Sequence, residues 1–561
     1  MRPLPVLLAA LALSVATPAA HAQTTVDKAA QAAWADAIRA HIEFLASDAL
    51  EGRGSGTRGG DLAARYIAAQ FTRLGLQPAG DDGTFFFKVP LISFTPAPTL
   101  SLGGTDLKYP GDFVLSPMRW DSVVTVDAPL VFAGHGIVAP EYQWNDYAGV
   151  DVKGKIVAVM VNDPGLRDST IFKGKVLTFY ARWTYKYEEA ARQGAAGVLL
   201  IHTEESATYP WAVVEGSFSG KQVRLETAAT SLKVAGWVQH DVMARAFTAA
   251  GDNLDQAMTR AGKRGFTAFE LPIAVAATVR ATMVRTQTYN VLGRLPGTGG
   301  PLAQEVVVIG AHYDHLGIGK PVDGDSIYNG ARDNAAGVGE MLAIAEAMSR
   351  AELKGKRSIL FVAFGGEEAG LLGSQAMIDR PFMPLKNVAA MLNFDGANLF
   401  GRTRDISAQG ADQSSLLGAL QAAARLEGLQ VTDDSLGMFR GSFFRSDNFP
   451  FARAGIPSLS FEPGAAYVGR PSDYRQKSQA DYNTKRYHRP QDEWGSWYNL
   501  DGAVQETRVG LRTAIYAADA SAQPIWDVDS EFRPAGEARV KPSPSKYYSY
   551  SSVSLSLHFY Y

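Results

Sequence analysis

The sequence contains no cysteine among its 561 residues. This absence excludes disulfides, thiolate metal ligands, a cysteine nucleophile and a lipid-modified cysteine behind a leader. An excess of charge of one sign is also missing, because 54 Lys and Arg residues against 57 Asp and Glu residues leave a formal net charge of -3. The near balance provides no broad cationic field, so we expect neither nucleic acid nor an anionic membrane surface as a partner.

Near the N-terminus, the apolar run is too short to span a membrane comfortably. Residues 4–15 form this run, Arg2 supplies a positive charge before it, and Ala20-His21-Ala22 has the small-x-small form of a cleavage site. The pattern predicts a signal peptide over residues 1–22, a mature chain that starts near Gln23, and a periplasmic or secreted location with no membrane attachment after signal removal. An N-terminal anchor or a buried helix is the alternative interpretation.

Apolar residues make up 46% of the chain, enough to bury large cores in two or three domains. Residues 30–74 have helical periodicity on both sides of a glycine-rich segment, residues 51–60. No strand pattern precedes this segment and no Gly-Lys-Ser/Thr follows it, which favours a plain turn over a phosphate-binding loop. A loop near the mouth of a site is the other interpretation.

Between residues 124 and 275 the pattern changes to short apolar strands separated by Gly, Pro and Asp. Predicted strands cover residues 130–133, 155–161 and 197–201, with a helix before the last. We interpret residues 124–275 as a separate, inserted β-rich domain. Its histidines, His135, His202 and His240, are scattered along the sequence and do not suggest a metal site.

The segment after the insert, residues 276–533, is expected to form an α/β domain, and residues 23–123 precede the insert. Mostly apolar strands are predicted at 305–309, 359–364, 388–394 and 456–461, and a helix with an apolar face follows Asn334. The pattern predicts a three-layer sandwich with a mixed, mostly parallel central sheet. The tail, residues 534–561, alternates in polarity near its end and suggests an edge strand or a disordered end.

Six residues near strand ends or turns carry the strongest functional pattern: His312, Asp333, Glu367, Glu368, Asp395 and His488. Three of the expected ligands follow separate apolar strands, so they should meet at one edge of the sheet. Oxygen and imidazole ligands without any thiol suit a pair of zinc-like ions, with Glu367 free to act as a base. Taken singly, each residue is more simply an ordinary charged side chain at a strand end.

Five motifs resemble those of the secreted double-zinc aminopeptidase family, to which glutamate carboxypeptidases and transferrin-receptor ectodomains are related. The motifs are HYDHLG at 312–317, DNAAG at 333–337, GEEAGLLGS at 366–374, NFD at 393–395 and YH at 487–488. Residues 154–159 and 194–201 of the insert also resemble the protease-associated domain that interrupts many members of this family. The resemblance then implies that the two flanking segments, 23–123 and 276–533, form one discontinuous peptidase domain.

The resemblance implies two Zn²⁺ ions. One would be held by His312 and Asp395, the other by Glu368 and His488, and Asp333 would bridge both. A bridging water between two cations loses a proton readily, which makes it a nucleophile.

The resemblance also assigns roles beside the metals. Glu367 becomes the general base and acid, Tyr487 the phenol that donates to the oxyanion, and Asp314 the residue that orients the His312 ring. Arg445 and Asp447 belong to a segment that lines the substrate pocket in relatives, although the two could equally form a surface ion pair.

Two departures from the family pattern concern the pocket. Asn448 replaces a histidine that relatives often carry, which puts a supporting role there in doubt. The segment 320–327 lengthens the loop between two ligands, and we expect it to reshape the pocket.

The expected function is that of an exported metallo-aminopeptidase that removes N-terminal residues from peptides with a two-zinc activated water. A dipeptidase or a glutamate-releasing carboxypeptidase remains open, because Arg440, Arg445 or Arg470 could bind a terminal carboxylate. A receptor-like binding protein without metals and a single-zinc enzyme that cyclises N-terminal glutamine are less favoured, since the full ligand set is present. The sequence leaves side-chain preference, oligomeric state, physiological metal and the role of the insert open.

Overall fold

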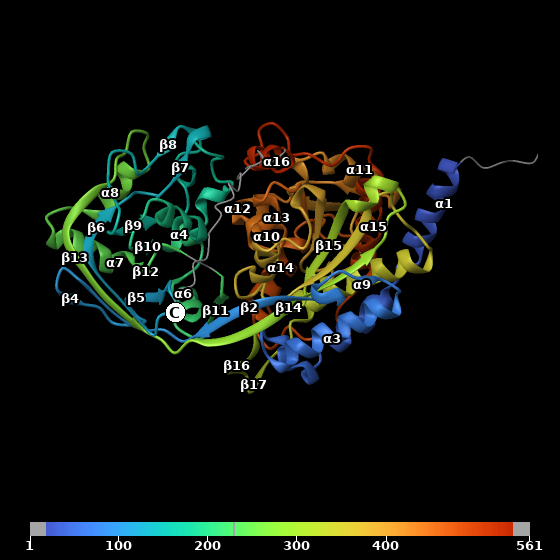
Figure 1. The fold of residues 1–561 in the computed structure, drawn as a ribbon, viewed down its shortest axis with the longest axis horizontal. Helices are drawn as coiled ribbons and strands as arrows, with labels where there is room; N and C mark the ends of the chain where they lie inside the picture. Colours follow the sequence, from blue (N-terminus) through green and yellow to red (C-terminus); the bar gives the residue numbers. More distant parts are fainter. Residues whose placement is uncertain (1–17, 228–229, 542–561) are drawn as a thin grey trace, which may run out of the picture.

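The computed structural model describes residues 18–227 and 230–541. These residues form two bodies that lie side by side, each built on its own sheet (Figure 1). The first body contains a ten-stranded sheet and the second an eight-stranded sheet. Strands β2, Phe86–Phe94, and β14, Val284–Leu295, belong to the first sheet and lie where the chain passes between the bodies.

The sheet of the first body has the order β11-β2-β14-β18-β15-β19-β22-β20-β21, with β1 beside β14. Its other strands are β1 Gln77–Pro78, β11 Gln222–Leu225, β15 Val306–His312, β18 Ser358–Phe364, β19 Val388–Phe394, β20 Asp405–Gln409, β21 Gln430–Val431 and β22 Ser458–Pro463. The central pairs β18-β15, β15-β19 and β19-β22 are parallel, whereas β11, β2, β14 and β18 pair antiparallel. The prediction of a mixed sheet is confirmed, but "mostly parallel" holds only for its centre.

Helices cover both faces of this sheet. Successive side chains of a strand point to opposite faces, so each strand contributes to the cores on both sides. Val307, Ile309 and Ala311 of β15 pack in one core, and Val306 and Val308 pack in the other. The first core contains residues of α2 Ala35–Leu45, α3 Arg58–Arg73, α9 Ala336–Arg350, α11 Leu416–Leu426 and α15 Asp501–Asp519. The second contains residues of α10 Leu372–Asp379 and α13 Asn448–Arg453. The predicted three layers are therefore present.

Helix α9 is more deeply enclosed than its sequence suggests. Every residue from Ala336 to Met348 is buried, although the sequence predicts one apolar face. The helix packs between β15, α2 and α15, so neighbours surround it on all sides. Small residues such as Ala343 and Ala347 permit this close packing.

The second body has the strand order β4-β3-β13-β6-β9-β10-β12-β5. Its strands are β3 Ala97–Leu102, β4 Thr105–Asp106, β5 Phe113–Pro117, β6 Val123–Phe132, β9 Ile156–Met160, β10 Gly197–His202, β12 Val234–Gln239 and β13 Phe269–Arg280. Its strands therefore lie between residues 97 and 280, a range that begins before the predicted boundary at 124 and from which β11 leaves to join the first sheet. The reason is long-range pairing, since β3 pairs with β13 and β5 pairs with β12.

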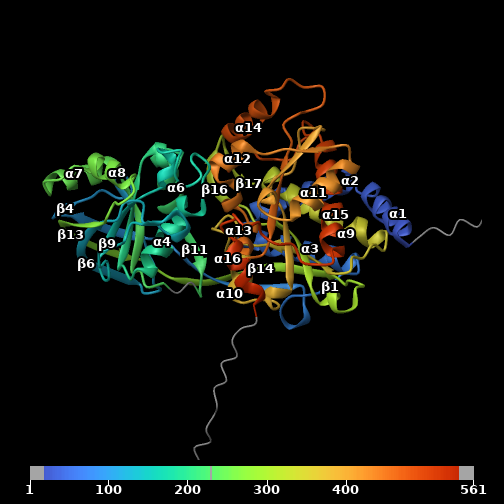
Figure 2. The same cartoon turned by 90° about the horizontal axis from the view of Figure 1, so that it is seen from above.

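The remaining helices and strands complete the two bodies. They are α1 Pro18–Gln31, α4 Trp183–Arg192, α5 Glu204–Ala207, α6 Trp211–Phe218, α7 His240–Ala249, α8 Leu254–Ala261, α12 Ser435–Arg440, α14 Tyr474–Lys485 and α16 Arg533–Val540, with the short pairs β7 Val138–Ala139 with β8 Trp144–Asn145 and β16 Gly317–Val322 with β17 Asp325–Tyr328. Helix α4 is the helix predicted inside the insert. Figure 2 shows α12 and α14 on the side of the first body that faces α6.

The structure describes only part of the predicted signal peptide and of the predicted C-terminal tail. Helix α1 crosses the predicted cleavage point after Ala22, and α16 covers the start of the predicted tail. Residues 1–17 of the predicted signal and the alternating end of the tail lie outside the described residues. Across the described ranges, we find no helix long and apolar enough to cross a membrane.

A pair of buried carboxyl groups joins two core helices. Glu340 of α9 is 2% exposed and Glu506 of α15 is 4% exposed. The two carboxyl groups interact electrostatically, and Glu506 Oε2 accepts the Asn398 N–H at 2.7 Å. Burial raises the pKa of Glu340 well above its usual range and the pKa of Glu506 to about 7. The pair therefore holds at least one proton below neutral pH.

We predict that this pair makes the free energy of unfolding fall as the pH rises. Because both folded-state pKa values are raised, the stabilisation is complete below the unfolded pKa of about 4.3 and is lost as the pH rises through about 7. In Glu340→Gln, the loss between pH 6 and pH 9 should be smaller than in wild type by on the order of 1–2 kcal/mol. Urea unfolding at pH 6 and pH 9 measures this change in the free energy of unfolding. The exposed Glu352, changed to Gln, is the control and should keep the wild-type dependence; an equal dependence in Glu340→Gln would contradict the assignment.

Candidate active site

Three neighbouring parallel strands deliver side chains to one edge of the first sheet. His312 is the last residue of β15, Asp395 directly follows β19, and Glu367 and Glu368 follow β18 after two glycines. Strand β15 lies between β18 and β19 and runs parallel to both, so their carboxyl ends meet. The predicted convergence at this edge is therefore present.

Asp333 and His488 come from segments outside the sheet. Asp333 lies in an irregular turn, residues 331–335, with φ -112° and ψ 91°, and α9 begins only at Ala336. Asp333 therefore lies before the helix and not in its first turn. Asp492 holds the turn by accepting the Asp333 N–H at 3.0 Å, and Asn334 Oδ1 accepts the Gly337 N–H at 3.0 Å at the start of α9.

The Asp333 carboxylate divides its two oxygens between two histidines. Its Oδ1 lies 3.3 Å from His312 Nε2, and its Oδ2 lies 3.4 Å from His488 Nε2. His312 Nε2 is also 3.2 Å from Asp395 Oδ1, and His488 Nε2 is 3.2 Å from Glu368 Oε2. The five side chains therefore form two adjoining groups of three ligands that share Asp333.

These spacings fit a pair of zinc-like ions. Two ligand atoms about 2.0–2.1 Å from a tetrahedral zinc ion lie about 3.3 Å apart, which the four distances of 3.2–3.4 Å match. Glu367 Oε2 is farther from His312 Nε2, at 3.9 Å. His315 and Glu368 also lie close enough to Asp333 to form a metal-binding group. However, His315 Nδ1 and Glu368 Oε1 are only 2.6 Å apart, which is a hydrogen-bond distance.

The ring of His312 is oriented by a main-chain carbonyl. Its Nδ1 lies 3.1 Å from the Asp314 carbonyl oxygen and 3.8 Å from the Asp314 carboxylate. Nδ1–H thus donates to the carbonyl, which directs Nε2 toward the other ligands. Asp314, the predicted partner, therefore orients this ring through its main-chain carbonyl and not through its carboxylate. That carboxylate instead accepts the Glu367 N–H at 3.1 Å and the Ser55 hydroxyl at 2.7 Å, which fixes the backbone of Glu367.

The electrostatics of the site follow from burial and from the paired charges. Burial raises the pKa of Glu367 well above its usual range. Burial acts in the same direction on Glu368, but His488 and His315 outweigh it and lower that pKa to about 2. Carboxylates raise the pKa values of His312 and His488 well above the usual range, against the effect of burial. Both imidazoles therefore have to release a proton when they ligate a cation.

The ligand set opens into a cavity of about 790 Å³. Thr208, Tyr209, Val213 and Ser217 of the second body line it, so that body forms one wall. The Tyr487 ring stacks on His488 with centroids 3.9 Å apart, and its side chain lines the same cavity. The predicted phenol therefore lies beside the ligands.

Two of the candidate substrate arginines line this cavity and one does not. Arg440 and Arg445 are exposed along the cavity, and within the described residues neither has a carboxylate partner. Arg470 does not line it and instead stacks over the Tyr474 ring.

Other expected pocket elements lie elsewhere. Asp447 is fully buried outside the cavity lining and accepts the Ser374 hydroxyl at 2.5 Å, so it neither contacts the pocket nor pairs with Arg445. Asn448 is also buried and donates to the Phe443 carbonyl at 2.9 Å. The long segment 320–327 forms the hairpin of β16 and β17 and does not line the cavity, which corrects the expectation that it reshapes the pocket.

The glycine-rich segment is not a plain turn. Arg53 is fully buried and donates to the main-chain carbonyls of Leu45, Tyr313, Asn329 and Gly330, while Ser55 holds Asp314. The segment therefore packs directly behind the ligand set. His315, the fourth residue of HYDHLG, is the site residue to which sequence reasoning gave no role.

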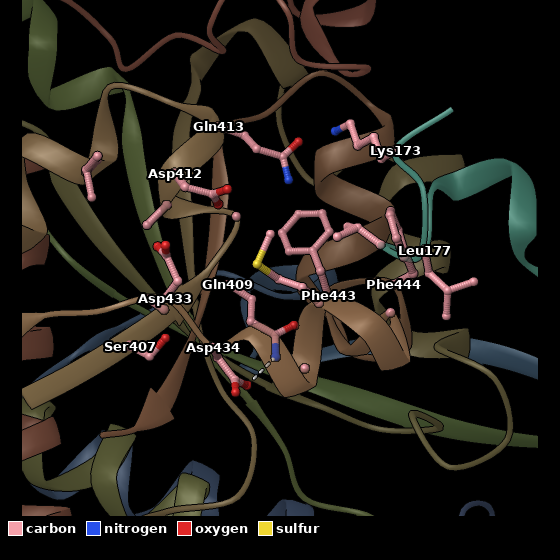
Figure 3. Close-up of a pocket in the computed structure, with 18 of the residues that line it drawn as sticks. Lys173, Leu177, Ser407, Gln409, Asp412, Gln413, Asp433, Asp434, Phe443 and Phe444 are labelled. Atoms are coloured by element: carbon pink, nitrogen blue, oxygen red, sulfur yellow. Dashed lines mark hydrogen bonds between the residues drawn. The ribbon is translucent and has the colours of Figure 1, made fainter. Parts of the chain in front are cut away.

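A second, smaller cavity of about 90 Å³ lies next to the large one (Figure 3). The two cavities share Asp434 and Gly437 in their linings. Lys173 and Leu177 reach the smaller cavity from the second body, and Gln409 Nε2 donates to Asp434 Oδ2 at 3.3 Å. Among the described residues, the side-chain groups able to hold a metal ion lie in the large cavity and not here.

Comparisons with known proteins give a consistent family. Residues 290–507 match the family model described as peptidase family M28. A probable zinc metalloprotease of Pyrenophora teres f. teres is 37% identical over 106 residues, which is 19% of this chain and 22% of that protein. Aminopeptidase YwaD of Bacillus subtilis is 25% identical over 425 residues, which is 74% of this chain and 73% of that protein.

The structure is similar to that of an aminopeptidase from Aneurinibacillus sp. strain AM-1, with a TM-score of 0.47, 20% identity and coverage of 90% of this chain and 98% of that one. The chain spans about a quarter or less of the length of the first two curated relatives it matches. The matched segment contains every residue of the two ligand groups. Over residues 290–507, this chain is similar to peptidase family M28.

Proposed function

We propose that this chain is an aminopeptidase that uses two zinc ions to remove N-terminal residues from peptides. The observation that carries the proposal is the division of the Asp333 oxygens between His312 Nε2 and His488 Nε2, at 3.3 and 3.4 Å. A carboxylate placed in this way can bind two ions at once. Each ion would have one further carboxylate ligand, from Asp395 or Glu368.

When bound, the zinc ions would polarise the scissile carbonyl and lower the pKa of a water molecule between them. Glu367 would take the proton of that water, because its carboxylate lies beside the ligands without matching their spacing. Its buried environment favours the protonated form, so the same group can then return the proton to the leaving amine. Asp314 keeps Glu367 in place through its main-chain N–H.

Tyr487 would donate its phenol hydrogen to the oxyanion that develops on the substrate carbonyl. Partial desolvation and then the Asp333 carboxylate raise the pKa of Tyr487 well above its usual range even though the residue is 46% exposed, so the phenol keeps its proton. The ring stacks on His488, which holds it beside the ligand set. A hydrogen-bond donor fixed in this way stabilises the transition state at little cost of reorganisation.

A second candidate within the same chemistry is a dipeptidase or a glutamate-releasing carboxypeptidase. The observation that favours it is the pair Arg440 and Arg445, which line the cavity without carboxylate partners in the described part of the chain. Guanidinium groups of this kind bind a terminal carboxylate well. The two candidates differ in which end of the peptide they require to be free.

Blocking one end of a peptide substrate distinguishes the aminopeptidase from the carboxypeptidase. A peptide with a free N-terminus should be hydrolysed from that end, and the same peptide with an N-acetyl group should react at least about 100-fold more slowly, because a blocked amine loses its charged contacts in the site. Mass spectrometry of the products identifies the residue released. C-terminal amidation is the matched control and should change the rate little. Loss of activity on amidation, with full activity on acetylation, would transfer the assignment to the carboxypeptidase.

The second prediction concerns Glu367. Glu367→Gln should keep two zinc ions per chain and lose about 10²–10⁴-fold in kcat, because the amide cannot accept a proton from water. Asp333→Asn is the contrasting variant, since it should lower the zinc content itself. Elemental analysis and single-residue chromogenic substrates measure both quantities. A fully active Glu367→Gln would show that Glu367 is not the base. An Asp333→Asn that still holds two ions tightly would show that Asp333 is not the shared ligand.

We also propose that the protein is exported and that the second body is a protease-associated domain. The domain assignment is supported by the family-like segments 154–159 and 194–201, which supply the adjacent parallel strands β9 and β10 of its core. Its residues line the cavity opposite α14, so a role in limiting substrate access follows.

Export rests on the leader pattern in residues 1–22. We expect the protein from a native extract to be enriched in the periplasmic or extracellular fraction and to begin near Gln23. Edman sequencing or N-terminal mass spectrometry of the fractionated protein checks this. Intact protein beginning at Met1 in the cytoplasmic fraction would contradict export.

A further inference from the structure

We infer that His315 is a positioning residue that restricts Glu368 to a single ligating oxygen, an inference that rests on the proposed two-zinc function. His315 Nδ1 lies 2.6 Å from Glu368 Oε1, while Glu368 Oε2 lies 3.2 Å from His488 Nε2. One oxygen of this carboxylate is therefore engaged behind the site and the other faces the ligands. No comparable second partner divides the oxygens of Asp395 among the described contacts.

The distances favour positioning over ligation by His315 itself. Ligands of one zinc ion lie about 3.3 Å apart, whereas His315 Nδ1 and Glu368 Oε1 are in hydrogen-bond contact. The ring is 2% exposed, and its other nitrogen, Nε2, is buried without a hydrogen-bond partner. The ring also packs edge-on against the His488 ring, with centroids 5.8 Å apart. His315 thus contacts two side chains of the same ligand group.

The glycine-rich segment fixes the position of this ring. The His315 N–H donates to the Arg53 carbonyl at 3.3 Å, and Gly54 forms an isolated β-bridge with His315. On another side, Gly330 has φ +57°, and a Cβ there would lie 2.6 Å from His315 Cγ. Arg53 in turn donates to the Gly330 carbonyl at 2.9 Å. Backbone from two segments therefore encloses the ring and leaves it little freedom to leave Glu368.

The consequence is specific to one of the two ions. With Oε1 engaged by an N–H donor, Glu368 presents Oε2 alone, in the same direction as His488 Nε2 and Asp333 Oδ2. Without the donor, the carboxylate can rotate or bind an ion through both oxygens, which changes the geometry of that position. The group formed by His312 and Asp395 has no contact with His315 in the described structure and should be affected little. Partners of this kind behind a ligand change metal affinity by about 10–100-fold.

The test compares three substitutions at His315 in the full-length chain. The amide of His315→Asn can place an N–H near the position of Nδ1. The amide of His315→Gln reaches the position of Nε2 instead, and His315→Leu has no donor. Competition with a chromogenic chelator measures the two zinc affinities of the metal-free protein. We expect His315→Leu and His315→Gln to weaken one ion at least about 10-fold and leave the other within about twofold of wild type. His315→Asn should stay within about threefold of wild type for both ions.

The control is His240→Leu on the second body, which removes a partly exposed histidine hydrogen-bonded to Asp255 and should leave both affinities unchanged. If His315→Leu does not fold, the contrast between Asn and Gln still decides the question. The inference would be overturned if His315→Gln bound both zinc ions with wild-type affinity. It would also be overturned if His315→Asn and His315→Gln lost zinc affinity equally. Because zinc affinity is measured without substrate, a wild-type protein that binds two ions but cleaves no peptide would contradict the proposed function and leave this inference standing.

Discussion

The carboxylate of Asp333 lies between two imidazoles, and the arrangement of the whole site depends on it. Each of its oxygens faces a different histidine, and each histidine faces one further carboxylate. Such a concentration of buried carboxylates is costly unless positive charge compensates for it. In the structure as described, protonated His312 and His488 supply part of that charge, and two divalent cations would supply more.

Keeping Asp333 in this position requires support from several segments. Asp492 accepts main-chain N–H groups of the turn that carries Asp333, and the Tyr482 hydroxyl donates to Asp492 at 3.0 Å. On the opposite side, Arg53 binds carbonyls on either side of the site and Ser55 holds Asp314. The site is therefore rigid because its loops are tied to buried side chains, which is the usual requirement for preorganised chemistry.

The second body changes the character of the site from an open sheet edge to a cavity with a second wall. The edge of the first sheet supplies the ligands, and Tyr209 and its neighbours on the second body supply a wall. Arg440 and Arg445 lie in the lining contributed by the first body. The first body thus supplies the ligands, and the second body supplies a wall of the substrate cavity. Substrate preference can therefore change without a change in the ligands.

Local sequence pattern determined the central strands, the helices around them and the identity of the ligands. Short apolar runs specify β15, β18 and β19, and parallel strands bring their carboxyl ends together whatever the surrounding loops do. The residue types His, Asp and Glu without cysteine then restrict the metal chemistry. These features depend on neighbours in sequence or on a general property of parallel sheets.

Contacts between residues far apart in sequence decided the rest. The second body begins at β3 because β3 pairs with β13, about 175 residues later. Asp314 turns its carboxylate to Glu367 and Ser55, and Asp447 is enclosed behind Ser374, because of packing that no local pattern encodes. His315 looks like any other residue of its motif until Arg53, Gly330 and Glu368 enclose it. The sequence by itself determined which side chains could bind metal, and only the tertiary structure decided which oxygen or nitrogen of each faces the site, because that choice depends on partners brought together by folding.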